Sequence, residues 1–468
     1  MLQVFSKDHK SHPDYGKMRR KAISITWPAF IELVMTSLFG MVDMIMVGQL
    51  SPAAIASVGL TNQPFFLLLA VFAAVNVGTS TLVAWNIGAK KPDEACNVTR
   101  QVLILNTLLG IFVTVIGIYF APNIVTFMGA NSDTFRDATL YFKIVAAGLA
   151  FQAVNMGVTA ALRGAGQTKL PMLYNAGSNL LNVFGNYVLI FGKFGFPEWG
   201  VAGAAVSTTA ARLIACLAGL YLIFFTKQSS ISLSIKGDYR INTGIVRQIF
   251  SIGIPAALEQ FVLQSGLMVF ARTVSSLGTS GFAAHQIGIN ISTLTFSPSQ
   301  AFGVAATTLV GQSLGAGDEG KAKEFADMIH HMAVLVALFM GVVFLLFSHQ
   351  LAGLYTEDLA VAAMAGTVLK ILALAQPGQS TQLAISGALR GAGDTLYPLY
   401  ACIFGIWIFR VFTAYIFVSI FHWGLIGAWI ALVLDQSARA LIVYLRYRSG
   451  KWKYVKAKIN KVEEAEAY

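Results

Sequence analysis

Long apolar segments, separated by short polar connections, make up almost the whole chain. Runs of about 18 or more apolar residues are typical of helices that cross a membrane. We predict twelve such spans, at residues 22–47, 54–85, 98–120, 138–161, 170–191, 199–225, 246–275, 281–311, 325–347, 360–388, 396–420 and 424–446. Several exceed the roughly 20 residues that a span needs, so tilted or protruding helices are expected. The pattern predicts an all-α integral membrane protein embedded in a lipid bilayer.

Charged residues are scarce and gather at the two ends of the chain and in short loops. Only 12% of the 468 residues are charged and 56% are hydrophobic, whereas soluble proteins carry roughly 25% charged residues. The net charge of +11 is compatible with nucleic-acid binding, but the basic residues flank the predicted spans, so no nucleic-acid partner is expected. They follow every second span, which predicts that both termini are cytoplasmic in a multi-pass protein of the inner (plasma) membrane.

The chain repeats itself with a nearly constant offset. "RGAGQT" (163–168) returns as "RGAGDT" (390–395), and "PAFIE" (28–32) returns as "PAALE" (255–259), both shifted by 227 positions because 390 − 163 = 255 − 28 = 227. Near the end, "WGVAGAA" (199–205) matches "WGLIGAW" (423–429) with an offset of 224, since 423 − 199 = 224. We therefore predict two pseudo-symmetric six-helix bundles.

The repeat also predicts how the chain is divided. The expected parts are a cytoplasmic N-terminal segment (1–21), an N-terminal six-helix lobe (22–225), a cytoplasmic linker (226–245), a C-terminal six-helix lobe (246–447) and a cytoplasmic tail (448–468). Because each lobe has an even number of spans, both lobes share one topology. Transporters built from such parallel repeats bind their substrate at the repeat interface and alternate access by rocking one repeat against the other.

These motifs resemble the multidrug and toxic compound extrusion (MATE) family, and most closely its DinF-type branch. The resemblance rests on "LRGAG" after the fourth and tenth spans, an Asp in span 1 followed by "VGQL", "PAALE" in span 7 and "VGQSLGAG" at the end of span 8. It implies a secondary antiporter that exports bulky, often cationic organic compounds, such as drugs, against an inward flow of H⁺ or Na⁺. H⁺ is the predicted coupling ion, no cofactor is expected, and we expect a monomer.

The resemblance also implies a polar network in the N-terminal lobe. The positions that match the family's pattern are Asp43, Asn182, Asn186 and Thr208. Asn186 stands where an archaeal-type member has Asp, and Gln379 stands where the NorM-type branch has a cation-binding Asp. Both departures weaken a Na⁺ site and leave Asp43 as the predicted proton-coupling residue.

Helix geometry agrees with that network. At about 1.5 Å per residue, Asp43, Asn186 and Thr208 each lie within roughly 13 Å of the outer end of their spans. The repeat partner of Asp43 is Phe270, so the polarity is confined to one lobe. The residues that we expect along a substrate cavity near this network are Met35, Thr36, Phe39, Gly40, Asn62, Gln63, Asn155 and Met172.

Other charged residues within the spans have two interpretations each. Glu32 and Glu259 are repeat partners that either line a path or brace helices, and the bracing role is at least as well supported. Asp435 and Arg439 are four residues apart, which predicts an ion pair within one helix. We expect Arg163 and Arg390 to hold helix ends or loop carbonyls.

Three alternatives to secondary drug transport have less support in the sequence. "GAGDEGKA" (315–322) resembles a phosphate-binding loop, but Ala322 replaces the hydroxyl residue that would hold Mg²⁺, and the loop joins two spans. An intramembrane enzyme would need a nucleophile with a base, or paired metal ligands, so the chain is not expected to be an enzyme. A lipid-linked oligosaccharide flippase would line its cavity with several cations, for which Arg212, Arg272 and Arg410 are the candidates. A Na⁺-coupled drug antiporter is the remaining alternative.

Overall fold

The computed structural model describes residues 15–226, 230–234, 237–356, 358–457 and 459, which form long helices joined by short turns. The N-terminal half consists of α1 (Tyr15–Gly48), α2 (Pro52–Gly88), α3 (Pro92–Phe127), α4 (Ser132–Ala147), α5 (Leu149–Gly164), α6 (Lys169–Phe191) and α7 (Gly200–Phe225). The C-terminal half consists of α8 (Thr243–Ser275), α9 (Gly278–Gly315), α10 (Glu319–Gly353), α11 (Leu359–Gly391), α12 (Leu396–Ile403), α13 (Thr413–Tyr415) and α14 (Gly424–Arg448).

Every predicted span falls on helical structure, but two spans are not continuous α-helices. The span predicted at 138–161 is broken at Gly148 into α4 and α5, which meet at a bend of 44°. The span predicted at 396–420 consists of α12 and α13 with π-helical stretches at Phe404–Phe412 and Ile416–Ile420. Regular apolar periodicity does not distinguish these variants from an unbroken helix.

Hydropathy alone recovers fewer spans than the architecture contains. Among the described residues, nine helices, or ten with the bent pair α4–α5, are long and apolar enough to cross a membrane. The two long helices that fall short are α6 and α9. α6 carries Asn175, Asn179, Asn182 and Asn186, and α9 carries several Gln, Ser and Thr residues. Their polar faces require partners inside the bundle, because lipid offers none.

The predicted domain boundaries differ slightly from the helix ends. Tyr15 begins α1, so part of the segment predicted as 1–21 is the first turns of this helix, while residues 1–14 lie outside the described residues. Most of the predicted linker 226–245 and part of the tail 448–468 are described, and Thr243 begins α8. The functional division into two lobes joined by this linker stays a prediction.

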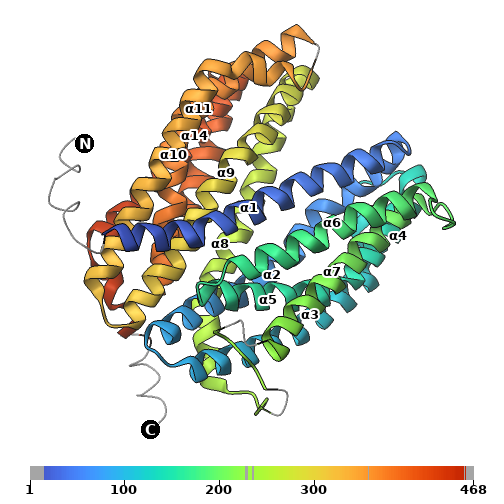
Figure 1. Cartoon of the computed structure of the whole chain (residues 1–468). Coiled ribbons are helices and arrows are strands. Elements are labelled where there is room, and N and C mark those ends of the chain that lie inside the picture. Colours follow the sequence, from blue (N-terminus) through green and yellow to red (C-terminus); the bar gives the residue numbers. More distant parts are fainter. Residues whose placement is uncertain (1–14, 227–229, 235–236, 357, 458, 460–468) are drawn as a thin grey trace.

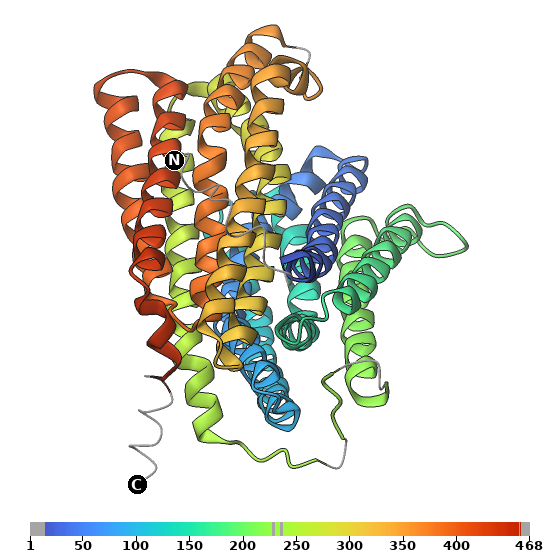
Figure 2. The ribbon, with the colours of Figure 1, turned by 60° about the vertical axis from the view of Figure 1, so that its left-hand side comes forward.

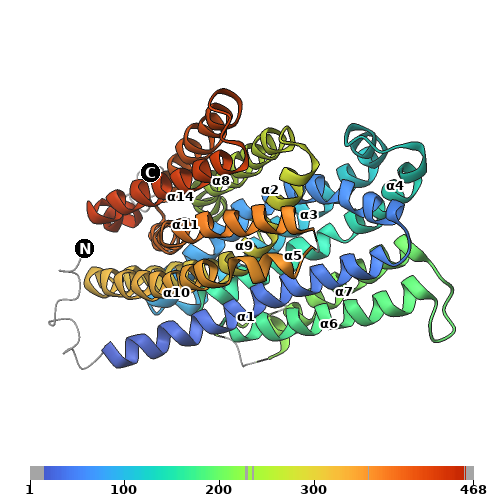
Figure 3. The same ribbon diagram turned by 90° about the horizontal axis from the view of Figure 1, so that it is seen from above.

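The helices form two groups that converge at one end of the molecule and diverge toward the other (Figure 1). α2 to α7 lie together with α1 in one group, and α8 to α14 form the other (Figures 1 and 2). The first turn of α1 and the last turn of α14 lie at the same end, as Figure 3 also shows. This arrangement agrees with the predicted fold of two six-helix bundles.

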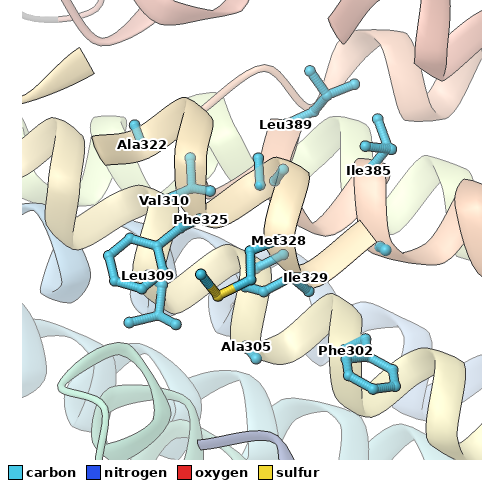
Figure 4. Packing of buried hydrophobic residues seen from close by; sticks show 14 of the residues in the cluster. Phe302, Ala305, Leu309, Val310, Ala322, Phe325, Met328, Ile329, Ile385 and Leu389 are labelled. Atoms are coloured by element: carbon cyan, nitrogen blue, oxygen red, sulfur yellow. The ribbon is translucent and has the colours of Figure 1, made fainter. Parts of the chain in front are cut away.

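The largest apolar core lies in the C-terminal half, where α9, α10 and α11 pack together. Phe302, Leu309, Phe325, Ile329 and Leu389 are all less than 8% exposed and interlock between these helices (Figure 4). Small residues such as Ala305 and Ala322 let the helices approach closely. The C-terminal half therefore has a closely packed apolar core between α9, α10 and α11.

The two halves meet where α2 crosses α9. A Cβ atom added to Gly88 would collide with the backbone carbonyl of Gln312, and one added to Gly315 would collide with the carbonyl of Trp85. These four residues form two repeat pairs, because 315 − 88 = 312 − 85 = 227. The crossing is therefore pseudo-symmetric, and glycine is required at both contact points because the two backbones touch.

Hydrogen bonds between the halves surround this crossing and obey the same symmetry. They run from Trp85 Nε1 to the Gly391 carbonyl (2.8 Å), from Gln312 Nε2 to the Gly164 carbonyl (3.1 Å), from Thr81 Oγ1 to the Arg390 carbonyl (2.9 Å) and from Thr308 Oγ1 to the Arg163 carbonyl (2.8 Å). The acceptors belong to the two "RGAG" motifs. These repeated motifs thus hold the two halves together at one end.

We expect Gly88→Ala to lower the apparent Tm of the detergent-solubilised protein by about 3–10 °C, because overpacking a close contact costs about 1–3 kcal/mol. Thermal unfolding followed by size-exclusion chromatography measures the change. Gly59→Ala is the matched control, since Gly59 lies on the same helix and a Cβ there meets open space. Equal Tm values for the two variants would contradict the close crossing.

Candidate functional site

A cavity of about 730 Å³ lies between the two halves and is lined mainly by the N-terminal half. Its walls come from α1, α2, α5, α6 and α7, and α9 and α11 close it from the other side with Gln300, Thr307 and Leu383, among others. Thr308 and Arg390 line the cavity and also belong to the α2–α9 crossing. The crossing therefore forms the closed end of the cavity.

Asp43 lines this cavity and is held by side-chain amides. Asn186 Nδ2 donates a hydrogen bond to Asp43 Oδ1 at 2.6 Å. The Asn182 amide, oriented so that both its nitrogen and its oxygen have partners, donates to the two carboxylate oxygens at 3.0 and 2.9 Å. Its oxygen then accepts from the backbone N–H of Thr208 at 3.1 Å and lies 3.2 Å from Ser207 Oγ. Asn182 and Asn186 are one turn apart on α6, so a single helix face presents both amides.

The structure thus brings the four predicted network residues, Asp43, Asn182, Asn186 and Thr208, into one place. Asn186 is fully buried, Asn182 is 5% exposed, and Thr208 lines the cavity. Ser207 joins them as a fifth member that the sequence did not indicate, because its hydroxyl donates to the backbone carbonyl of Asn182 at 2.8 Å. A serine next to Thr208 is not in itself a sign of a role in the network, so no sequence pattern singles out Ser207.

The predicted cavity residues divide into two sets. Those that line the cavity are Thr36, Phe39, Gly40, Asn62 and Asn155, whereas Met35, Gln63 and Met172 lie outside its lining. Met35 precedes the lining residue Thr36, and Gln63 follows the lining residue Asn62. A shift of one position on a helix rotates the side chain by about 100°, which is enough to turn it away from the cavity. Met172 lies nearly one turn before Asn175, the first residue of α6 that reaches the cavity. The sequence prediction therefore included more residues than line the cavity.

An ion pair forms part of the cavity wall close to the crossing. Arg163 Nη2 donates to Glu32 Oε2 at 2.8 Å, and Asn175 Nδ2 donates to the other carboxylate oxygen at 2.7 Å. Asn155 Nδ2 continues the chain by donating to Asn175 Oδ1 at 3.1 Å. Glu32 is 5% exposed. This pair braces α1 against α5 and α6, which agrees with the bracing interpretation of Glu32 rather than with a free carboxylate.

The C-terminal half contains the symmetric ion pair. Arg390 Nη2 lies 2.7 Å from Glu259 Oε1, and both pairs are separated by 131 positions, since 163 − 32 = 390 − 259 = 131. The expectation that the two arginines hold helix ends or loop carbonyls missed these partners, although the arginine carbonyls do accept hydrogen bonds at the crossing. The equal separation was the sequence signal that could have revealed the pairs.

Deeper in the C-terminal half, one acid binds two arginines. Asp435 is fully buried and forms the predicted ion pair with Arg439 on the same helix, whose Nη2 donates to Asp435 Oδ2 at 3.0 Å. It also lies 2.7 Å from Arg410 Nη2, which joins α14 to the π-helical stretch of the preceding span. Arg410 is therefore part of a buried triad rather than of the cavity surface.

Gln379 is 4% exposed and does not line the cavity either.

The corresponding region of the N-terminal half is open. With the offset of 224 that relates the last spans of each half, Asp435 and Arg439 correspond to Ala211 and Ala215, since 435 − 224 = 211 and 439 − 224 = 215. Both alanines line the cavity. Small side chains leave space in one half where the other half is filled by the triad, so the cavity is one-sided.

Arg212 is a cavity residue that the sequence offered only as a flippase candidate. It lines the cavity, its Nη1 donates to the Val145 carbonyl at 3.2 Å, and its guanidinium lies 4.6 Å from the centre of the Phe65 ring. Arg272, another candidate, is exposed near the end of α8 and does not line the cavity. Within the described residues, no three His, Cys, Asp or Glu side chains gather as metal ligands do.

Comparison with known proteins places this architecture in a family. The MatE family model matches twice, at residues 28–188 and 255–416, once in each half of the chain. The chain belongs to the MatE family. The predicted MATE resemblance and the internal repeat are thereby confirmed, and the family consists of transporters rather than enzymes.

Relatives of similar length cover nearly the whole chain. A probable multidrug resistance protein NorM from Thermotoga maritima is 32% identical over 446 residues, which are 95% of this chain and 96% of the relative. The uncharacterized transporter YisQ of Bacillus subtilis is 30% identical over 430 residues, which are 92% of this chain and 94% of the relative.

Solved structures share the fold. An outward-facing MATE family transporter of the MOP superfamily superposes with a TM-score of 0.86 at 24% identity, over 96% of this chain and 97% of that one. A MOP superfamily transporter from Pyrococcus furiosus, described as having a binding pocket of reverse polarity, gives a TM-score of 0.87 at 24% identity, over 94% and 97% of the two chains. These similarities show the fold.

We expect Arg163→Met to destabilise the MatE protein more than the double variant Glu32→Gln/Arg163→Met. The single change leaves a buried carboxylate without its counter-charge, which costs about 3–5 kcal/mol, whereas the double change removes both charges. Thermal unfolding of the two variants in the same detergent measures the difference. If Glu32→Gln lowers the stability by the same amount in the Arg163→Met background as in the wild-type protein, the two side chains act independently.

Proposed function

We propose that this chain is a proton-coupled antiporter of the DinF-type branch that exports bulky, often cationic organic compounds from the cytoplasm. The observation that carries the proposal is the environment of Asp43. It is a carboxylate in a cavity of about 730 Å³, and its hydrogen-bond partners among the described residues are neutral amides. The name of the Thermotoga relative, a probable multidrug resistance protein, supports drugs as the class of substrate.

The partners of Asp43 differ from those of the other membrane acids. Glu32, Glu259 and Asp435 each bind an arginine at 2.7–2.8 Å, so neutralising one of them would leave a buried guanidinium without its counter-charge. Asp43 has no arginine or lysine within ion-pair distance among the described residues. Its neutral form therefore costs no ion pair, and this favours Asp43 as the residue that exchanges a proton.

The proposed cycle uses this exchange as the switch. Ionised Asp43 attracts a cationic compound while Asn182 and Asn186 donate hydrogen bonds to its carboxylate. A proton arriving from outside removes that attraction, the network rearranges, and the compound leaves outward. Proton and drug then compete for one site, and each shifts the conformational equilibrium only by its differential affinity for the two states.

The same observations favour H⁺ over Na⁺ and an antiporter over a flippase. A Na⁺ site needs several oxygen ligands, whereas the groups nearest to Asp43 present amide nitrogens to it. Three arginines line the cavity, but Arg163 and Arg390 are paired with glutamates, so among the described residues only Arg212 is a lining arginine without a carboxylate within ion-pair distance. A flippase that carries a pyrophosphate would be expected to line its cavity with several such cationic side chains.

The orientation and assembly belong to the same proposal. The basic N-terminus and tail, together with the basic loops at the end where the helices converge, support two cytoplasmic termini in the cell membrane. The cavity is then closed toward the cytoplasm by the α2–α9 crossing. The proposed functional unit is a monomer, because the cavity is completed within one chain.

Efflux of the cationic dye ethidium from proteoliposomes tests the proposal. We expect wild-type protein to export ethidium when an inward proton gradient is imposed and not when a Na⁺ gradient is imposed at clamped pH. Asp43→Asn removes the titrating group and should abolish gradient-driven export while the protein stays monodisperse. Asn182→Ala and Asn186→Ala should slow export by about tenfold to a hundredfold, because each removes hydrogen bonds to a charged group worth about 1.5–3 kcal/mol.

Asp133→Asn is the matched control, since Asp133 is an exposed carboxylate near the start of α4 and does not line the cavity. This variant should export ethidium at the wild-type rate. Normal export by Asp43→Asn under an inward proton gradient would overturn the proposed switch. Full export under the Na⁺ gradient alone would overturn the choice of coupling ion.

A further inference from the structure

We propose that Arg212 is the anion-binding subsite of the cavity, so that the substrates that fit best are amphiphilic zwitterions carrying a carboxylate besides their cationic group. This inference rests on the proposed function, because it names the class of compound that the same cavity exports.

Four other arginines inside the helix bundle are neutralised by a carboxylate. Those with a carboxylate at 2.7–2.8 Å are Arg163, Arg390, Arg410 and Arg439. Arg212 has no carboxylate within ion-pair distance among the described residues, although it lies in the middle of α7. A charged side chain at this depth is costly without a partner, and such a residue indicates a functional site by default.

The guanidinium of Arg212 is fixed on one side and free on the other. One N–H group bonds to the Val145 carbonyl, and the Phe65 ring covers one face of the guanidinium. An arginine has five N–H donors. The remaining nitrogens of Arg212 have no hydrogen bond to the described residues, and they are accessible rather than buried. Because Arg212 lines the cavity, these donors face its interior. A planar fork of this kind binds a carboxylate with two parallel hydrogen bonds.

The position of Arg212 relative to Asp43 sets the spacing of the substrate. Thr208, which contacts the Asp43 network, and Arg212 are four residues apart on α7, or roughly 6 Å along the helix axis. Both line the same cavity as Asp43. A compound with a basic group at Asp43 and a carboxylate about one helical turn farther from the outer end of α7 would satisfy both charges.

A purely structural role for Arg212 is the alternative. Val145 belongs to the last turn of α4, next to the bend at Gly148, so the arginine could simply hold this broken span. Thr209 contacts the same turn, because its hydroxyl donates to the Ile144 carbonyl at 2.9 Å, and Thr209 does not line the cavity. A structural role would make the two residues similar in effect, and neither would distinguish ligands by charge.

Binding of two matched dyes to purified protein in detergent tests the inference without transport. Rhodamine 6G is a cationic ethyl ester, and rhodamine 19 is its zwitterionic free acid, so the pair differs in the carboxylate. We expect wild-type protein to bind rhodamine 19 about tenfold more tightly than rhodamine 6G in fluorescence polarisation, which corresponds to one charge-assisted interaction of about 1.4 kcal/mol.

Arg212→Met should remove this preference by weakening rhodamine 19 binding about tenfold while leaving rhodamine 6G binding within twofold. Arg212→Lys should keep part of the preference, because it retains the charge but not the fork. Thr209→Val, the control for the bend, should keep the full preference. The Arg212 variants are compared with wild type by size-exclusion chromatography, and Arg212→Lys provides the answer if Arg212→Met fails to fold.

The inference is overturned if wild-type protein binds both dyes with equal affinity, or if Arg212→Met or Arg212→Lys retains the full tenfold preference. Either result leaves the proposed export function standing, because that function is measured by ethidium efflux, a reaction of a cation without a carboxylate. Loss of ethidium efflux in Asp43→Asn together with an unchanged dye preference in the Arg212 variants would separate the two proposals.

Discussion

A charged side chain inside a membrane needs a partner, and most of the internal architecture of this protein follows from that constraint. Glu32 with Arg163 and Glu259 with Arg390 brace the same helices in both halves. Asp435 holds Arg410 and Arg439 in the core of the C-terminal half. Asp43 is the exception among these acids, because amides rather than guanidinium groups bind it. An acid without an ionic partner is free to serve as a switch.

The two halves are related by sequence but have different interiors. Their symmetry is closest at the crossing of α2 and α9, where Gly88 and Gly315 allow backbone contact and four hydrogen bonds repeat in pairs. The symmetry ends where Ala211 and Ala215 line a cavity and their counterparts Asp435 and Arg439 fill the space. The symmetric part joins the two halves at one end, and the asymmetric part leaves a cavity that is lined mainly by the N-terminal half.

The sequence predicted the helices, the repeat and the residues near Asp43, because these depend on periodicity and on positions along a helix. The MATE resemblance indicated Asp43, Asn182, Asn186 and Thr208, and their similar depth in three spans agreed with it. The pairing of Glu32 with Arg163 was missed, because periodicity does not tell which face of α1 meets α5. The same holds for Ser207 and for the contact of Arg212 with Val145, which depends on a bend at Gly148 that the apolar pattern conceals. Met35, Gln63 and Met172 were expected along the cavity, and helix rotation or depth excludes them from the lining.

The most direct test of the account is a count of the protons released when a cationic dye binds to purified protein in a weakly buffered detergent solution. If drug and proton compete for Asp43, binding of rhodamine 6G to wild-type protein should release up to one proton per bound dye, with a maximum at the pH where Asp43 is largely protonated. Asp43→Asn should release none for each dye that it binds. Equal proton release by wild type and Asp43→Asn, per bound dye, would contradict the central role of this carboxylate.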